Sequence, residues 1–354
     1  MIKKWTLAVI LALAFTGNSV AQVALNVLFP PANNSDVAKY LMPSLLVSGV
    51  DLVINWSDIT SDGKTFNFKI PDAAAAPWIA AHKTVNFVVW ANSNSAGGTV
   101  GNASVPAYIW NAMGSTNYVN CVTQAGTQRL PNYLSPVWIK GYQAAMAAIA
   151  SHYKGKVGYI RFGLGHGGET IPGAGWNSPT TACGLAYKKW GVTIATWEGY
   201  LKTMLDYEVT LPDVQKMVGI TPLGSPSIQV PDYIASIAAP QGIGFGSQGL
   251  EASDLKGCAT STADWCELFA KYKSTHVPLE LQTIGPSCAA DKGCTGNQAL
   301  TGPLSPLLAY GVAHGATIME IYWQDWCTAL CPDSGTRQYA NQYLAALKAA
   351  AGSR

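Results

Sequence analysis

The sequence predicts a (β/α)8 barrel, in which eight parallel strands alternate with helices around one closed sheet. Two observations carry this prediction. Eight short apolar runs recur along the chain, and stretches with helix-like patterns lie between them. Most of the runs are continuously apolar, as expected of parallel strands that are buried on both faces. An open, doubly wound sheet is the alternative, but no GxGxxG turn follows the first run.

The eight predicted strands cover residues 24–29, 50–56, 85–91, 158–165, 217–222, 242–248, 277–282 and 317–323. The helices predicted between and after them cover residues 35–47, 72–82, 136–153, 193–209, 264–272 and 337–350. The first helix begins with a Ser–Asp pair suited to capping, the second is rich in alanine, and the third carries apolar residues at helical spacing. This alternation predicts a single domain at residues 22–354.

Two insertions interrupt the alternation, at residues 92–134 and 170–190. The first contains a polar, glycine-containing stretch and then a strand-like run at 107–110, and the second is rich in Gly and Pro. Both follow predicted strands, the third and the fourth. In a (β/α)8 barrel such loops lie at the C-terminal face, where active sites are built, so we expect both insertions near a functional site.

Composition limits the class of protein. Of the 354 residues 49% are apolar and only 12% are charged, which is typical of a folded chain with a large core. The formal net charge is +2, with 22 basic and 20 acidic residues. Two of the basic residues, Lys3 and Lys4, lie in a segment expected to be removed, so the remaining chain has no net charge. A neutral chain is a poor candidate for binding nucleic acid through a basic surface.

Residues 1–21 have the pattern of a secretory signal peptide. Lys3 and Lys4 form the positive region, residues 7–15 the apolar region, and residues 19–21 a small-residue cleavage site. An uncleaved N-terminal anchor is the alternative, but the apolar run is short for a membrane span and no later run is long enough. We therefore expect a secreted or periplasmic protein with no membrane segment after cleavage.

Eight cysteines agree with export, because an even number suits disulfides and oxidising compartments permit them. Proximity in the sequence suggests three local pairs and leaves one long-range pair: Cys258–Cys266, Cys288–Cys294, Cys327–Cys331 and Cys121–Cys183. A zinc site is the alternative, but there is no CxxC spacing and no His close to a Cys pair.

Three glutamates occupy unusual positions. Glu169 follows the fourth predicted strand, Glu280 lies inside the seventh, and Glu320 lies inside the eighth. A carboxylate in a strand is costly to bury without partners, so each is a candidate for function or for a structural ion pair. Two carboxyl groups on opposite walls of a barrel mouth are the minimal machinery for glycoside hydrolysis. The alternatives are that Glu169 caps the next helix and that Glu280 pairs with a buried base such as Arg161.

On these residues the sequence resembles clan A glycoside hydrolases, the retaining (β/α)8 group that includes many β-galactosidases, β-glucanases and mannanases. That clan places its acid/base Glu after strand 4 and its nucleophile on strand 7, the positions of Glu169 and Glu280. Residues 49–59, followed by Gly63, Phe66 and Phe68, resemble the stretch after strand 2 in β-galactosidase-like members. The resemblance implies a secreted O-glycosyl hydrolase that cleaves an oligo- or polysaccharide by double displacement. It implies Glu280 as nucleophile and Glu169 as acid/base.

One position departs from the clan. The residue before the acid/base Glu is usually Asn, which binds the sugar 2-hydroxyl, and here it is Gly168. The stretch 163–169, Gly-Leu-Gly-x-x-Gly-Glu, is also similar to the pattern around the acid Glu of β-amylases, which invert configuration and cut α-linkages. An inverting glucan hydrolase that uses the same two carboxylates is therefore the alternative enzyme. A carbohydrate-binding barrel without catalysis is the alternative outside enzymes.

Five further residues are candidates for substrate binding. Aromatic faces suit the C–H-rich faces of sugars, and polar side chains at strand ends suit the hydroxyls; the candidates are Trp56, Asn92, His166, Gln248 and Trp323. The resemblance adds that Trp323 fits the clan's tryptophan beneath the cleaved sugar. Core packing is the alternative for the tryptophans, and loop hydrogen bonding is the alternative for the polar residues.

Other chemistries find little support. The five histidines are dispersed, and neither an HxH nor an HExxH pattern occurs, so we expect no catalytic metal. A serine hydrolase needs a GxSxG turn; residues 244–249 come near it but are offset, and no convincing His–Asp pair follows. Glycoside hydrolysis needs no cofactor, and none is expected. The role of Glu320 stays open, including as a replacement for Glu280.

Overall fold

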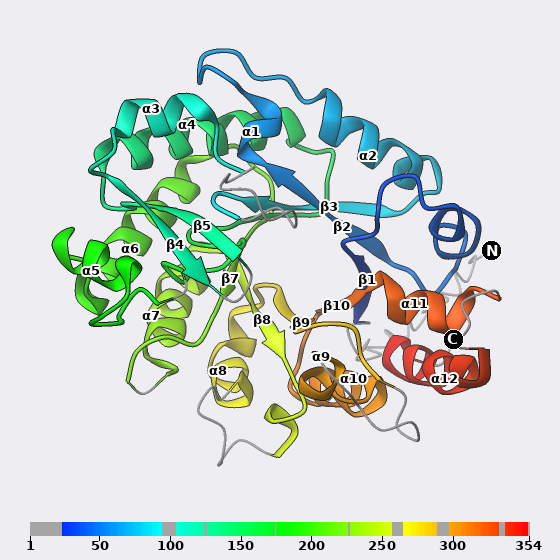
Figure 1. Ribbon diagram of the computed structural model, residues 1–354. Helices are drawn as coiled ribbons and strands as arrows, with labels where there is room; N and C mark the ends of the chain where they lie inside the picture. The colour runs from blue at the N-terminus through cyan, green and yellow to red at the C-terminus, as the bar shows by residue number, and fades with distance from the viewer. Residues whose placement is uncertain are drawn as a thin grey trace, which may run out of the picture.

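The computed structural model describes residues 23–93, 104–123, 126–173, 175–225, 227–256, 265–288, 297–332 and 337–352. Eight parallel strands close into a barrel in the spatial order β1-β10-β9-β8-β7-β6-β3-β2. Helices surround this barrel, as Figure 1 shows. The predicted (β/α)8 fold is confirmed.

Each barrel strand overlaps its predicted run. The strands are β1 (Ala24–Leu28), β2 (Gly49–Asn55), β3 (Thr84–Trp90), β6 (Ile160–Phe162), β7 (Lys216–Ile220), β8 (Gly244–Leu250), β9 (Leu279–Thr283) and β10 (Ile318–Tyr322). The largest difference is at β6, where only three of the eight predicted residues pair. The glycines that follow Phe162 turn the chain instead of extending the strand, and positive φ angles at Gly167 and Gly168 are part of this turn.

The helices agree less well with the sequence. The α-helices are α1 (Trp56–Ile59), α2 (Lys69–Ala80), α3 (Ala107–Met113), α4 (Pro136–Tyr153), α5 (Ala182–Lys189), α6 (Ile194–Thr210), α7 (Gln229–Ala238), α8 (Trp265–Tyr272), α9 (Asn297–Thr301), α10 (Leu304–Ala313), α11 (Trp323–Leu330) and α12 (Ala340–Ala351). Single turns of other helix types are η1 (Val37–Leu41), η2 (Ala239–Gln241), η3 (Asp254–Lys256), η4 (Lys273–Thr275) and η5 (Arg337–Tyr339).

Two predictions were wrong. The helix expected at 35–47 ends near Met42, because Pro43 follows directly and has no N–H group to donate to the preceding turn. The strand-like run at 107–110 is part of the helix α3. The buried side of this helix consists of Ile109, Trp110 and Met113. A short run of apolar residues is compatible with a buried helix as well as with a strand, so this pattern alone could not separate the two.

The two insertions are joined. The first contains an antiparallel hairpin of β4 (Tyr118–Thr123) and β5 (Gly126–Pro131), and the second contains α5. A disulfide between Cys121 and Cys183 links the hairpin to α5, with Cα atoms 5.5 Å apart. The predicted long-range pair is thus confirmed, and so is Cys327–Cys331 within and just after α11. Cys288 is disulfide-bonded too; Cys294, Cys258 and the side chain of Cys266 lie outside the described part.

The interior of the barrel changes character along its axis. At the N-terminal end Ala24, Tyr159, Met217 and Ile318 pack into a small apolar cluster. Above it the inward positions are polar or charged, and they include Asp51, Arg161, Glu280 and Glu320, all with no exposed surface. Barrel interiors are more often filled by Val, Ile and Leu, so this charged layer is a feature of the present chain.

Inward-facing glycines make room for the charged layer. A Cβ atom on Gly246 would lie 2.4 Å from the Cβ of Glu280, and one on Gly219 would lie 2.6 Å from Cδ of Gln248. Both distances are too short for real atoms. Because Gly219 on β7 and Gly246 on β8 have no side chains, the long polar side chains of neighbouring strands have room inside the barrel.

Candidate active site

Glu169 lies in the turn after β6, at the C-terminal face of the barrel. Consecutive backbone bonds tighten this turn: the N–H groups of Leu164 and Gly165 both donate to the Glu169 carbonyl, at 3.1 and 2.7 Å. A Cβ atom at Gly168 would lie 2.8 Å from the Trp90 ring, so a larger residue there would displace the tryptophan. The glycine at this position is thus explained by the close packing of the turn against β3.

The Glu169 carboxyl is suited to holding a proton near neutral pH. Its side chain is partly exposed, yet burial of the carboxyl raises its pKa to about 7, against the lowering effects of the Thr221 hydrogen bond and of the Arg161 charge. The Thr221 hydroxyl donates to Oε2 at 2.9 Å. A carboxyl group with this pKa exchanges protons readily at the pH where many enzymes work.

Glu169 opens onto a cavity of about 300 Å³ at the ends of β7, β8 and β9. Thr221 and Gln248 line the cavity beside it, and Glu251 and Asp254 line it from the segment after β8. The remaining lining residues are Ile220, Pro222, Gly249, Ser253, Trp265 and Ile284. The cavity therefore combines a proton-holding carboxyl, further carboxyl groups and an amide within one small space.

Glu280 lies elsewhere, inside the barrel. It is the second residue of β9, in register with Gly246 on one side and Ile318 on the other, and none of its surface is exposed. Arg161 Nη1 donates to its Oε1 and, at 2.7 Å, to Oε2 of Glu320. This is the ion pair that the sequence left open as the alternative to catalysis. The predicted nucleophile is out of reach of any substrate in this structure.

The charged layer contains more acid than base. Tyr159 donates to Asp51 and, at 3.0 Å, to Glu320, so three carboxyl groups surround the Arg161 guanidinium. Burial and the neighbouring carboxylates raise the pKa of Asp51 and of Glu280 well above the usual values. The layer thus holds protons on some carboxyl groups, and it keeps Arg161 charged. Glu320 belongs to this layer and does not reach the cavity.

Arg161 connects the layer to the mouth. Its Nη2 donates to Oε1 of Gln282 at 2.8 Å, and Gln282 lies two residues beyond Glu280 on β9. With its amide turned to satisfy both neighbours, Gln248 accepts from Nη2 at 3.1 Å and donates to the Gly168 carbonyl at 3.2 Å. Gln248 therefore bridges the interior arginine and the Glu169 turn, while its side chain also lines the cavity.

His166 lies in the same turn as Glu169 and is partly exposed. Burial lowers its pKa to about 4, so the imidazole is neutral at physiological pH. Within the described part of the chain its buried Nδ1 has no hydrogen-bond partner. Of the residues predicted from sequence to bind substrate, the structure therefore places His166 and Gln248 near Glu169.

Trp56 and Asn92, also predicted to bind substrate, lie in the core and do not line the cavity beside Glu169. Trp56 has no exposed surface and packs edge-on against Trp138, with ring centroids 5.5 Å apart. Asn92 is also fully buried, and its Nδ2 donates to the Tyr133 hydroxyl at 2.9 Å. Core packing and loop hydrogen bonding, the alternatives weighed for these two residues, describe them correctly.

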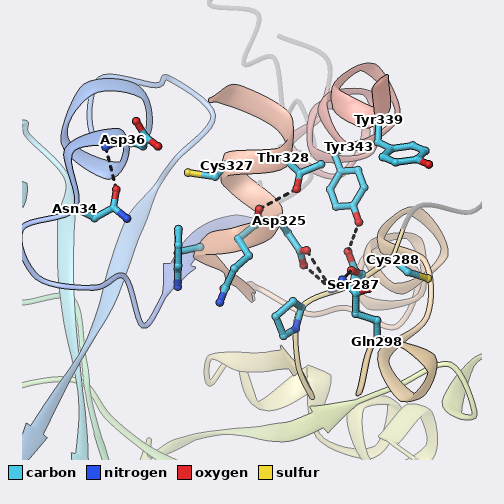
Figure 2. A pocket seen from close by; sticks show the side chains of 13 residues that line it. Asn34, Asp36, Ser287, Cys288, Gln298, Asp325, Cys327, Thr328, Tyr339 and Tyr343 are labelled. Atoms are coloured by element: carbon cyan, nitrogen blue, oxygen red, sulfur yellow. Dashed lines mark hydrogen bonds between the residues drawn. The ribbon is translucent and has the colours of Figure 1, made fainter. Parts of the chain in front are cut away.

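Trp323 is partly exposed but belongs to a different cavity, of about 370 Å³. It is the first residue of α11 and does not continue the strand as predicted. Figure 2 shows this second cavity, with Asp325 and Tyr343 directed at Ser287. The Ser287 N–H donates to both oxygens of Asp325, at 3.0 and 3.1 Å, and the Ser287 hydroxyl donates to the Tyr343 oxygen at 3.2 Å.

The sequence analysis missed the residues that complete the first cavity. Glu251 directly follows β8 as Glu169 follows β6, and Asp254 comes three residues later. The signal was available, because Glu251 lies three residues beyond the predicted strand at 242–248, closer than Glu169 lies to the end of its own predicted strand. Tyr322, at the end of β10, was also missed; its partly exposed ring lies edge-on to Phe29, with centroids 6.2 Å apart.

The described residues contain neither a candidate metal cluster nor a candidate membrane span. No group of three or more His, Cys, Asp or Glu side chains in that part of the chain has an arrangement that could hold a metal ion. No helix among the same residues has the length and hydrophobicity needed to cross a membrane.

Solved structures with the same fold include glycoside hydrolases. The catalytic domain of a β-amylase from Paenibacillus polymyxa is 13% identical over 85% of this chain and 92% of its own, with a TM-score of 0.56. A family 10 xylanase from Bispora is 11% identical over 86% and 84%, with a TM-score of 0.52. Xylanase 10B from Thermotoga petrophila is 11% identical over 86% and 82%, with a TM-score of 0.51. At these identities the likeness shows a shared barrel fold.

No protein-family model matches the sequence, and no curated protein matches it. The chain therefore shares its architecture with two kinds of glycoside hydrolase, and its chemistry has to be inferred from its own residues.

Proposed function

We propose that the protein is a glycoside hydrolase in which Glu169 is the general acid. One observation carries the proposal: Glu169, with a pKa raised to about 7, opens onto a cavity at the C-terminal face of the barrel that holds further carboxyl groups. In (β/α)8 enzymes this face carries the active site. Structures of the same fold that are named as a β-amylase and as xylanases support the class of reaction.

In the proposed reaction the protonated Glu169 gives its proton to the glycosidic oxygen as the bond from that oxygen to the anomeric carbon breaks. The leaving sugar departs with a free hydroxyl. A water molecule supplies the new hydroxyl at the anomeric carbon, and its remaining proton passes to a carboxylate. Thr221 and Gln248 orient this chemistry, Thr221 by holding Oε2 of Glu169 and Gln248 by fixing the Glu169 turn.

Asp254 also lines the cavity, but it is buried and accepts the Glu251 N–H at 2.8 Å, which leaves two candidates for the second carboxylate. The double displacement expected from the resemblance uses Glu280, which would have to leave Arg161 and emerge from the barrel interior. Glu251 needs no such movement, because it lines the same cavity as Glu169. We therefore assign the second role to Glu251. The anomer formed first distinguishes attack by Glu251 on the sugar, which retains configuration, from activation of water, which inverts it.

The function is tested by the release of reducing ends from a panel of neutral polysaccharides and aryl glycosides. Glu169→Gln keeps the shape of the side chain and removes the proton donor, so we expect kcat to fall by about 10²–10⁴ on substrates with poor leaving groups. Aryl glycosides that need little protonation should lose much less. Equal activity of wild type and variant on every substrate that is cleaved would refute Glu169 as the acid.

The second role is tested by comparing Glu251→Ala with Glu280→Ala on a substrate that the wild type cleaves. We expect Glu251→Ala to be inactive, and added azide to restore cleavage if Glu251 is a nucleophile, because azide takes the place of the missing group. Folded Glu280→Ala should keep activity within about tenfold of wild type, since Glu280 is out of contact with the cavity. The reverse result would restore Glu280 to the role that the sequence implied.

We also propose that the protein is exported. Residues 1–21, which have the signal-peptide pattern, lie outside the described residues, so support comes from the cysteines. Disulfides link Cys121 to Cys183 and Cys327 to Cys331, and such bonds persist mainly in oxidising compartments. N-terminal sequencing of the mature protein is expected to begin at Gln22. A chain that keeps Met1 and stays in the reducing cytosol would contradict export.

A further inference from the structure

The second cavity lies at the same end of the barrel as the first, and the segment after β9 lines both: Ile284 lines the first cavity and Pro286 the second. The other walls of the second cavity come from the segments that follow β1 and β10, whereas those of the first follow β6, β7 and β8. Trp323 and Gln324 line it at the start of α11, and Asn34 and Asp36 line it from the segment after β1. At about 370 Å³ the space is of the size that holds one or two sugar rings.

The walls of this cavity are held by bonds that do not depend on a ligand. Asp325 is almost fully buried and accepts two hydrogen bonds from the Ser287 N–H group. Gln298 donates to the Ser287 carbonyl at 2.9 Å, and Tyr343 accepts from the Ser287 hydroxyl, as Figure 2 shows for Tyr343 and Asp325. The disulfide Cys327–Cys331 braces α11 from within. A cavity that is formed in advance loses little entropy when it binds.

The lining selects the chemistry of a ligand. Two carboxyl groups, Asp36 and Asp325, and the amides of Asn34, Gln298 and Gln324 line the cavity, while none of its described lining residues is Lys, Arg or His. Anionic ligands are therefore disfavoured. Carboxyl and amide groups pair well with hydroxyls, and the partly exposed Trp323 offers an aromatic face for the C–H-rich face of a sugar. A neutral, polyhydroxylated ring meets all three conditions.

Tyr322 connects the elements that carry the two cavities. Its ring lies edge-on to Phe29, with centroids 6.2 Å apart, and Phe29 lies edge-on to Trp90, against which the turn of Glu169 packs. Tyr322 immediately precedes Trp323, which lines the second cavity. A ligand that runs across the mouth of the barrel past Tyr322 would therefore reach from one cavity to the other.

We propose that the cavity around Trp323 and Ser287 is a distal binding site for a sugar ring of a neutral polysaccharide chain whose scissile bond lies at Glu169. This proposal rests on the proposed function and adds the substrate class: a neutral chain of several sugars that spans the mouth, and not a disaccharide or an acidic glycan. Trp323 stacks on the distal ring, and the side chains of Asn34 and Gln324 bind its hydroxyls.

The proposal is tested by binding to Glu169→Gln, measured by calorimetry with a neutral disaccharide and a neutral hexasaccharide of the polysaccharide bound best. The hexasaccharide should bind the more tightly. Adding Trp323→Ala should weaken hexasaccharide binding about tenfold, since loss of one aromatic anchor typically has this effect, and should change disaccharide binding by less than about twofold. The matched control is Trp176→Ala, which removes a partly exposed tryptophan of the second insertion and should change neither.

The outcome separates this proposal from the proposed function, because binding needs no turnover. If the wild type hydrolyses nothing but Trp323→Ala still weakens the hexasaccharide selectively, the distal site stands and the hydrolase does not. If cleavage is confirmed but Trp323→Ala changes both ligands equally or neither, the distal site is overturned. Tighter binding of a hexasaccharide of uronic acids than of the neutral one would overturn the assigned charge preference.

Discussion

Two carboxyl groups that the sequence assigns to one active site have opposite environments. Glu169 ends a glycine-rich turn and opens onto a cavity, with one hydroxyl as its partner. Glu280 is enclosed in the barrel and held by Arg161 among two other carboxyl groups. The difference teaches that the position of a carboxylate along the barrel axis decides its surroundings. A carboxylate beyond the C-terminal end of a strand can meet a substrate, whereas one within a strand meets the barrel interior. Gln282, two residues beyond Glu280 along β9, is also buried and accepts a hydrogen bond from Arg161 Nη2, so even this position belongs to the barrel interior.

The largest expected effect follows from removing the only base of the charged layer. Arg161→Met leaves Asp51, Glu280 and Glu320 without their counter-charge, so we expect it to cost about 3–5 kcal/mol of unfolding free energy. The loss should be greater at pH 8 than at pH 5, because protonation relieves the carboxyl groups as the pH falls. Urea unfolding at both pH values measures this.

The control is Arg129→Met, on the partly exposed hairpin, which should cost less than about 1 kcal/mol at either pH. Equal losses of unfolding free energy in the two variants would mean that Arg161 stabilises the protein no more than a partly exposed arginine does.

The two glutamates should affect stability in opposite directions. Glu280→Ala removes a partner of buried Arg161 and leaves a hole, so a loss of about 2–4 kcal/mol is expected. Glu169→Ala removes a partly desolvated carboxyl that ends in a cavity, and it should leave the stability at pH 8 unchanged or raised. Chemical denaturation of both variants under the same conditions compares them. A Glu169→Ala protein that is less stable than Glu280→Ala would invert the assignment of the two regions.

The stability contributed by Glu169 should depend on pH in a defined direction. Because its pKa is raised to about 7 in the folded protein, the folded state binds a proton between about pH 4.5 and pH 7 that the unfolded state has released. Wild-type stability should therefore fall as the pH rises through this window. Glu169→Gln does not ionise and should escape the fall, which amounts to about 3 kcal/mol at most.

The measurement is the difference in unfolding free energy between Glu169→Gln and wild type at pH 4.5 and at pH 8. A difference that does not grow with pH would show that Glu169 ionises normally.

The inward glycines offer a smaller test of the same comparison. Gly246→Ala would press a methyl group onto Glu280, so we expect a loss of about 1–3 kcal/mol by overpacking. Gly249 lines the open cavity, and a Cβ atom there would meet only Ile284, at 4.0 Å. Gly249→Ala is the matched control and should be nearly neutral in thermal unfolding. A neutral Gly246→Ala would mean that the charged layer has room to rearrange.

The smallest effect concerns the pH profile of the proposed reaction. Thr221→Val removes the hydroxyl that stabilises ionised Glu169, so the pKa of Glu169 should rise by about 0.5–1 unit. The wild-type kcat/KM should fall above about pH 7 as Glu169 loses its proton, and in the variant this fall should begin at a higher pH. A downward shift of the profile would contradict the direction of this hydrogen bond. Steady-state measurement of kcat/KM across the pH range, on one confirmed substrate, provides the check.

The sequence by itself determined the barrel, because eight apolar runs separated by helical stretches have few other ways to bury both faces of a parallel sheet. It also indicated Glu169 as a site candidate and suggested the pairing of Cys121 with Cys183, which the structure confirms. The barrel and the candidate Glu169 depend on local sequence patterns. The cysteine pairing depends on which cysteines remain after the local pairs are assigned.

Tertiary structure alone decided which polar residues meet. The alternation of strand side chains places Glu280 inward but does not fix its height relative to Arg161 on another strand, which depends on the register of the closed sheet. In the same way, Trp56 is buried because it packs against Trp138, which is distant in the sequence. Trp323 is not part of the last barrel strand, because α11 begins at this residue. Contacts between segments far apart in the chain carry no local signal, so the second cavity appeared only in three dimensions.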